Sequence, residues 1–131
     1  DRTIVYSELA SVLADCDWLV LCCPLAEQTN RLISAEMLAR LPPRARLVNV
    51  GRGGVLDETA LIDALVTGRL AGAYLDVFEK EPLPASSPLW SLPSVWISPH
   101  NAASSSGNRT REVALFSNRL MAFLANGRTS A

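Results

Sequence analysis

Short apolar runs that alternate with segments of helical spacing constrain the fold of this chain more than any other feature. Four such runs cover residues 18–22, 47–50, 71–75 and 95–97, and residues 4–6 form a weaker fifth. Strands that alternate with helices feed a parallel sheet. The run at 18–22 is apolar throughout, a pattern typical of a strand buried on both faces. The sequence therefore predicts an α/β fold.

Capping residues mark where the predicted helices begin. Ser7 precedes a short helix that extends to residue 13, and Ser34 precedes a helix that ends before Pro42. Asp57 precedes a third helix, which ends at Gly68. A longer helix is expected over residues 104–125, with its end near residues 126–127. The proline-rich stretch at 78–93 is a long connection, and such connections are often functional.

Composition excludes several classes of partner. The chain has 131 residues, 49% of them hydrophobic, and a formal net charge of -1, so we expect neither a nucleic-acid nor a membrane partner. No signal segment is visible, which predicts a cytoplasmic location. Cys16, Cys22 and Cys23 match neither a disulfide framework nor spaced zinc ligands. We therefore expect reduced, mostly buried thiols and no metal site.

Chemistry-bearing residues follow the predicted strands. In a parallel sheet the carboxyl ends of the strands lie at one edge, where ligands bind, and Arg52, Asp76 and His100 each follow a strand. Arg52 lies among glycines and can grip a carboxylate, His100 can exchange protons near neutral pH, and Glu81 can orient a histidine. Each has a plainer explanation as a surface charge or a structural histidine. The group as a whole is harder to explain by packing.

Three ordered motifs resemble one protein family. They are NVGRGGVLDE at 49–58, LDVF at 75–78 followed by Glu81-Pro82, and SPH at 98–100. These look like successive signatures of the D-2-hydroxyacid dehydrogenases, and the likeness extends from about residue 6 to residue 127. The resemblance implies a partial Rossmann-like, doubly wound parallel sheet that lacks the first β-α-β unit.

The resemblance also implies catalytic roles and a cofactor, NAD or NADP. His100 would be the acid/base, Glu81 its carboxylate partner, and Arg52 the anchor for the substrate carboxylate. Hydride would pass between the nicotinamide and the keto carbon of a small 2-oxoacid while His100 donates a proton to the carbonyl oxygen. Arg52 would stabilise the negative charge that develops on that oxygen.

Cofactor contacts are implied by the same motifs. Asp76 would meet the nicotinamide carboxamide, although a turn cap is an equal alternative for it. The remaining implied contacts are Cys23, Pro24 and Thr29 near the adenosine, and Val50, Gly51, Arg52, His100, Ala102 and Ala103 near the nicotinamide.

The sequence departs from a complete family member in two respects. It has neither a second, substrate-binding domain nor a GxGxxG turn, because no glycine precedes Gly51. We therefore expect residues 1–131 to be the C-terminal portion of an NAD(P)-binding domain, inactive alone. The apolar face of the last helix would be left open or would bury itself in a neighbour.

Several readings of the whole protein stay open. Glu81 stands where formate dehydrogenases have glutamine, which argues against that branch. Glyoxylate or hydroxypyruvate reductases are favoured over phosphoglycerate dehydrogenases, and a homodimer is implied. The alternatives to an enzyme are an NAD(H)-sensing binding module of the corepressor type and a structural fragment.

Overall fold

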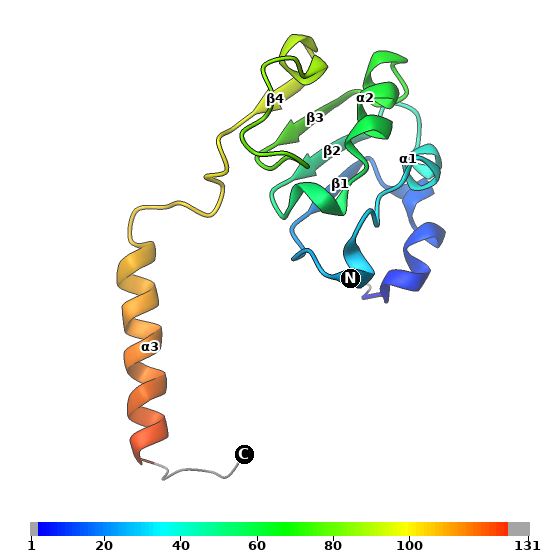
Figure 1. Ribbon diagram of the computed structural model, residues 1–131. Helices are drawn as coiled ribbons and strands as arrows, with labels where there is room; N and C mark the ends of the chain where they lie inside the picture. The colour runs from blue at the N-terminus through cyan, green and yellow to red at the C-terminus, as the bar shows by residue number, and fades with distance from the viewer. Residues whose placement is uncertain (1–2, 126–131) are drawn as a thin grey trace.

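The sheet forms as the apolar runs predict. The structure, a computed structural model, describes residues 3–125. Four parallel strands lie in the order β1-β2-β3-β4, with bounds β1 Trp18–Leu21, β2 Arg46–Asn49, β3 Gly72–Leu75 and β4 Val95–Ile97 (Figure 1). The α/β class and the parallel sheet are thus confirmed.

Helices α1, Ala35–Arg40, and α2, Glu58–Val66, begin where their caps predict. Ser34 accepts a hydrogen bond from the Met37 amide, and Asp57 accepts one from the Ala60 amide. Gly68, in the left-handed region with φ of 71°, follows the end of α2. Short 3₁₀ helices supply the remaining turns, namely η1 Tyr6–Ser11, η2 Leu13–Asp15, η3 Glu27–Thr29, η4 Gly53–Val55 and η5 Pro88–Ser91.

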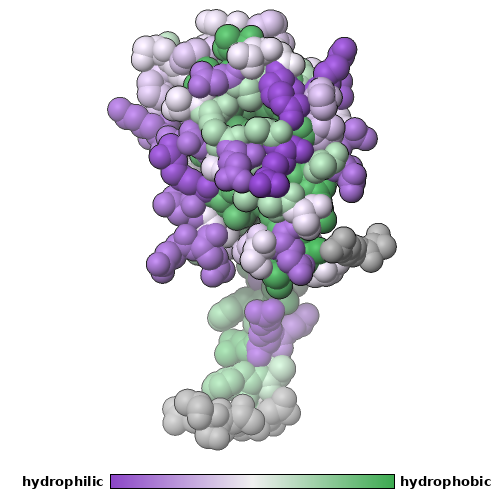
Figure 2. Space-filling view, turned by 90° about the vertical axis from the view of Figure 1, so that its right-hand side faces the viewer, coloured by the Kyte–Doolittle hydropathy of each residue, from purple (hydrophilic) through white to green (hydrophobic). Residues whose placement is uncertain are grey.

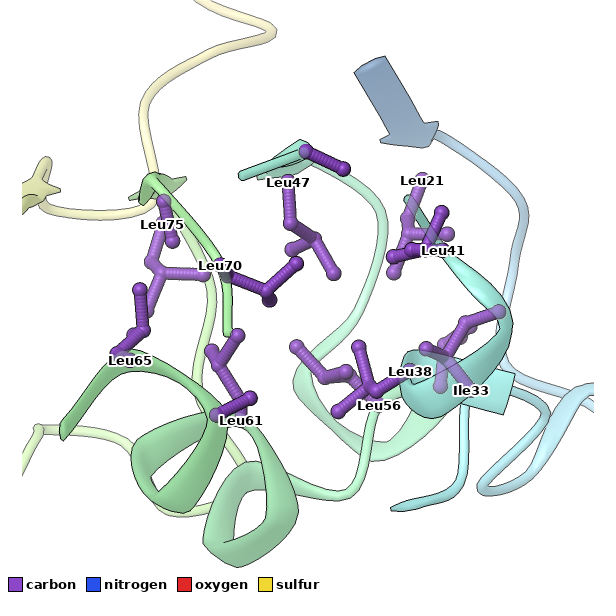
Figure 3. Close-up of a cluster of buried hydrophobic side chains, with 14 of the residues drawn as sticks. Leu21, Ile33, Leu38, Leu41, Leu47, Leu56, Leu61, Leu65, Leu70 and Leu75 are labelled. Atoms are coloured by element: carbon purple, nitrogen blue, oxygen red, sulfur yellow. The ribbon is translucent and has the colours of Figure 1, made fainter. Parts of the chain in front are cut away.

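The hydrophobic core lies between one face of the sheet and the helices α1 and α2. Figure 3 shows leucines of the strands directed toward leucines of the helices. Leu21, Leu47 and Leu75 come from the strands, while Leu38 and Leu61 come from the helices. The parallel pairing gives all four strands the same direction, so the loops that follow them gather at one edge of the sheet.

Two predicted elements at the start of the chain are wrong. Residues 4–6 form no strand, and the chain enters η1 at Tyr6. Ser7 lies inside η1 and caps nothing, since the cap position is Val5. A β-strand needs a hydrogen-bonded partner strand, and the sheet offers none to this segment among residues 3–125.

The last helix begins later than predicted. Helix α3, Asn108–Ala125, starts after Gly107, whose φ of 88° lies outside the helical region and so prevents an earlier start. The end predicted at residues 126–127 lies outside the described residues. In Figure 1 α3 extends away from the sheet, and in Figure 2 it lies below the main body with hydrophobic side chains at its surface. Phe116 is 67% exposed on this helix.

The second face of the sheet is open in the described part of the chain. Trp18 and Val20 of β1 are 57% and 55% exposed, and Trp96 of β4 is 74% exposed. The prediction that β1 is buried on both faces is therefore wrong, because no helix of residues 3–125 covers this face.

The cysteine prediction is corrected at the same strand. All three thiols are free, but Cys22 is exposed, and Cys16 and Cys23 are only half-buried. Cys22 follows Leu21, so the alternation of a strand directs it away from the core. Within residues 3–125 no group of three or more histidine, cysteine or acidic residues could hold a metal ion. The same residues contain no helix with the length and apolarity needed to cross a membrane.

Candidate active site

Three loops at one edge of the sheet bring the predicted catalytic residues together. Arg52 follows β2, Glu81 lies in the connection after β3, and His100 follows β4. Because the strands are parallel and adjacent, all three loops leave the sheet on the same side.

His100 and Glu81 form a close pair. The Nδ1 atom of His100 lies 2.7 Å from Oε2 of Glu81, and the other carboxylate oxygen accepts a hydrogen bond from the Phe78 amide. The hydrogen bond to His100 lowers the pKa of Glu81; burial opposes this, while the Phe78 amide and the charges of His100 and Arg52 reinforce it. The pair therefore favours an ionised glutamate beside the imidazole.

Asp76 organises the loop that carries His100. Its side chain is only 1% exposed, and its carboxylate accepts hydrogen bonds from the Ser98 hydroxyl and the amides of Asn101 and Ala102. Burial raises the pKa of Asp76, but the bonds from Ser98, Ala102 and Asn101 and the charge of His100 together bring it below its ordinary value. The group is thus a buried carboxylate whose bonds hold the next loop.

Asn49 does the same for the loop that carries Arg52. Its buried amide accepts from the Gly51 N–H and donates to the Arg52 carbonyl oxygen, both at 3.2 Å. The Arg52 guanidinium is exposed and donates to the Gly51 carbonyl oxygen at 2.7 Å. The backbone of this loop is therefore fixed, while its cation faces solvent.

Glycines let these loops press against one another. A Cβ at Gly53 would lie 1.9 Å from the carbonyl group of Phe78, and a Cβ at Gly51 would lie 2.6 Å from the Cys23 carbonyl oxygen. Only residues without a side chain allow this approach. The loops after β1, β2 and β3 are consequently in backbone contact.

Thr29 braces the first loop. It is 1% exposed, and its hydroxyl bonds to the carbonyl oxygen of Pro24 and to the amide of Ala26. Thr29, Asn49 and Asp76 are the buried polar residues of the described chain, and each holds one loop. Two of them, Thr29 and Asp76, were expected as cofactor contacts, and the structure engages their side chains within the protein.

Asn49 was not predicted as a site residue, although it opens the first motif. The available signal was a single amide inside the apolar run 47–50, because a buried amide needs bonding partners. Among the other expected cofactor contacts, Cys23 and Val50 are half-buried and Pro24 is exposed. Ala102 and Ala103, also expected contacts, are exposed directly after His100.

A pocket of about 690 Å³ lies beside the His100–Glu81 pair. Its wall is mainly apolar, and the polar residues Asp76, Glu81, Ser98 and His100 contribute to it. The lining residues are Asp76, Phe78, Glu81, Pro82, Leu83, Trp90, Ile97, Ser98, Pro99 and His100. An apolar pocket with a few converging polar groups is the usual form of a small-molecule site.

Comparison with known proteins finds relatives that are named as reductases of 2-oxoacids. The glyoxylate/hydroxypyruvate reductase B of Pectobacterium carotovorum is 44% identical over 120 residues, which are 92% of this chain and 38% of the relative. The chain thus spans well under half the length of that protein.

Solved structures agree in fold. A D-isomer specific 2-hydroxyacid dehydrogenase from Xanthobacter autotrophicus, in complex with NADPH and MES, matches with a TM-score of 0.72 and 48% identity over 76% of this chain and 32% of that one. An NADPH-dependent glyoxylate/hydroxypyruvate reductase from Sinorhizobium meliloti, in complex with NADP and sulfate, matches with a TM-score of 0.82 and 30% identity over 98% of this chain and 44% of that one. The Rossmann-like fold is thereby confirmed.

The family match covers most of the chain. Residues 1–102 match the family described as the D-isomer specific 2-hydroxyacid dehydrogenase, NAD binding domain. The match includes all three strand-end loops with Arg52, Glu81 and His100. This chain therefore belongs to the D-isomer specific 2-hydroxyacid dehydrogenase family.

Proposed function

We propose that residues 1–131 are the C-terminal portion of the NAD(P)-binding domain of an oxidoreductase. Its reaction is hydride transfer between NAD(P) and a small 2-hydroxy or 2-oxo acid. The observation that carries the proposal is the 2.7 Å contact between His100 Nδ1 and Glu81, on the same edge as the Arg52 loop. An acid/base histidine oriented by a carboxylate, at the same sheet edge as an exposed arginine, suits an anionic substrate with a carbonyl group.

His100 exchanges the proton in this scheme. Its Nδ1 is engaged by Glu81, so Nε2 is the atom that gives a proton to the substrate oxygen and takes it back in the oxidative direction. Glu81 holds the tautomer and stabilises the imidazolium. Arg52 binds the substrate carboxylate in a two-pronged grip and offsets negative charge on the oxygen.

The residues present suit the nicotinamide half of the coenzyme. Ala102 and Ala103 are small and exposed beside His100, and Asp76 lines the pocket with one carboxylate oxygen that accepts a single bond within the protein. Cys23 and Pro24 follow β1 at the same edge, where they would meet the adenosine half. When bound, NAD(P) supplies or accepts the hydride at the substrate carbon.

Glyoxylate and hydroxypyruvate are the substrates we propose first, because relatives named for these activities cover nearly the whole chain. A cytoplasmic homodimer without nucleic-acid or membrane partners completes the proposal. The sensing-module alternative gains no support from these relatives, whose names are those of reductases and dehydrogenases.

The proposal is tested with the longer protein that contains this chain and the rest of the enzyme. Reduction of glyoxylate and of hydroxypyruvate is followed as the oxidation of NADH or NADPH at about 340 nm. Arg52→Ala should abolish turnover, Arg52→Lys should restore only part of it because lysine lacks the planar fork, and His100→Ala should cost at least about a hundredfold. Arg40→Ala, on the exposed side of α1, is the matched control. Unchanged rates in Arg52→Ala or His100→Ala would remove that residue from the mechanism.

A further inference from the structure

A chain of hydroxyl groups connects the open sheet face to the His100 loop. Tyr74 belongs to β3, in register with Val48 and Trp96. Its hydroxyl lies 2.8 Å from the Ser98 hydroxyl oxygen, and Ser98 in turn contacts the Asp76 carboxylate. Tyr74 is half-buried and outside every motif named above.

The number of available protons sets the donor and acceptor in each hydrogen bond of this hydroxyl series. Ser98 has one hydroxyl proton and donates it to Asp76, so its oxygen must accept from the Tyr74 hydroxyl. Asp76 also receives two backbone N–H groups, from Asn101 and Ala102, which can only donate. Every donor therefore points toward the carboxylate, and a chain that ends on a charged acceptor is strengthened by that charge.

The backbone of His100 needs such support. Its φ of 51° lies in the left-handed region, which is unfavourable for a residue with a side chain. The His100 amide donates to the Asp76 carbonyl oxygen, and the next two amides donate to the Asp76 carboxylate. These bonds determine a conformation that places the imidazole against Glu81.

We propose that Tyr74 and Ser98 are positioning residues, which hold His100 in its proton-transfer geometry by fixing the Asp76 carboxylate under the loop 98–102. Neither residue touches the reacting atoms. The effect on catalysis rests on the proposed function. The effect on the position of His100 concerns only the structure of residues 1–131.

Amide hydrogen exchange in the 131-residue chain tests the structural part. Ser98→Ala should speed exchange of the Asn101 and Ala102 amides by about tenfold, and Tyr74→Phe by about threefold, because each loses a bond that holds the acceptor. Ser98→Thr keeps the hydroxyl and should stay within about twofold of the parent chain. Tyr6→Phe removes the same hydroxyl from exposed η1 and is the matched control.

The single histidine gives a second readout. The side-chain ¹⁵N signals of His100 report its bond to Glu81, and they should broaden or shift in Ser98→Ala and Tyr74→Phe but not in Tyr6→Phe. If Ser98→Ala fails to fold, the nearly isosteric Tyr74→Phe decides. Parent-like exchange and ¹⁵N signals in Tyr74→Phe would overturn the proposal, even if Ser98→Ala had an effect.

Steady-state kinetics of the longer protein that contains this chain and the rest of the enzyme test the catalytic part. Ser98→Ala should lower kcat about tenfold, with KM for the 2-oxoacid within about twofold, and Ser98→Thr should recover kcat. Equal losses in Ser98→Ala and Ser98→Thr would contradict a role for the hydroxyl. An inactive parent enzyme would contradict only the proposed function. The exchange and ¹⁵N data would still decide whether the Tyr74 and Ser98 hydroxyl groups hold His100 in place.

Discussion

Two single residues hold this site together in different ways: Glu81 through its charge, and Gly53 through its lack of a side chain. Glu81 is stabilised in its ionised form, chiefly by its hydrogen bond with His100. Gly53 admits the backbone of Phe78 and Glu79 at a distance that no Cβ would tolerate. Both features make predictions about stability that do not require turnover.

The Glu81 carboxylate should make stability depend on acid pH. Its pKa is lowered from the ordinary value of 4.5, so the stability it contributes is present above about pH 4.5 and is lost as the pH falls through the lower, folded-state pKa. Glu81→Gln should therefore flatten the acid decline of the free energy of unfolding, measured by urea denaturation from about pH 7 to pH 3. Glu27→Gln, an exposed carboxylate on η3, is the control. Superimposable acid limbs for Glu81→Gln and the parent chain would count against the prediction.

Gly53→Ala should destabilise the fold by about 3 kcal/mol, because the new methyl group meets backbone and the loops after β2 and β3 must separate. Gly54→Ala is the matched control. There the nearest atoms are the terminal methyl groups of Leu25 at 3.2 and 3.3 Å, which can move. Chemical denaturation of both variants gives the comparison, and similar losses would refute the proposed loop contact.

At the scale of elements, capping strength differs between the two core helices. Asp57 accepts from the Ala60 amide at 3.0 Å and pairs with Arg31 at 3.3 Å, whereas Ser34 accepts from the Met37 amide at 3.4 Å. A carboxylate also interacts favourably with the positive end of the helix dipole. Helix α2 is therefore the better anchored of the two at its start.

Asp57→Ala should lower the free energy of unfolding by about 1 kcal/mol, and Ser34→Ala by less. The larger loss follows from the shorter bond and the charge of Asp57. Denaturation at low and high salt checks the cause, since screening should reduce the effect of Asp57→Ala but not that of Ser34→Ala. A larger loss for Ser34→Ala would show that the cap geometry does not set the order.

At the scale of the whole molecule, α3 and the open sheet face stand apart from the core. Every described side chain of α3 after Asn108 is exposed, and the helix extends away from the sheet (Figure 1). The stability of the remaining fold should therefore not depend on α3, because most helical stability in proteins comes from tertiary packing, and α3 has none against the sheet.

Removal of residues 105–131 should leave the free energy of unfolding within about 0.5 kcal/mol of the full chain, because α3 buries no apolar surface against the core. Urea denaturation followed by tryptophan fluorescence measures the sheet directly, since Trp18, Trp90 and Trp96 all precede the cut. A loss above about 1 kcal/mol would mean that α3 packs on the sheet in solution.

The sequence by itself determined the four strands of the sheet, helices α1 and α2 and their order, but not the segment before η1 or the start of α3. Apolar runs, the caps Ser34 and Asp57, and the stop at Gly68 are local features, and local features act within a few residues of chain. Parallel topology then places the residues after each strand at one edge, so the convergence of Arg52 and His100 was predictable too.

Only the tertiary structure decided which groups are buried and which partners they bind. Asp76 and Asn49 are buried and hold loops through hydrogen bonds, and Trp18 is exposed. The Tyr74 hydroxyl bonds to the Ser98 hydroxyl, 24 residues away in sequence. The same polar residue at a strand end can face a ligand or hold a loop, and its own neighbours in sequence do not distinguish the two. The physical reason is that burial and hydrogen-bond partners are set by segments remote in the chain, whereas periodicity and capping are set by adjacent residues.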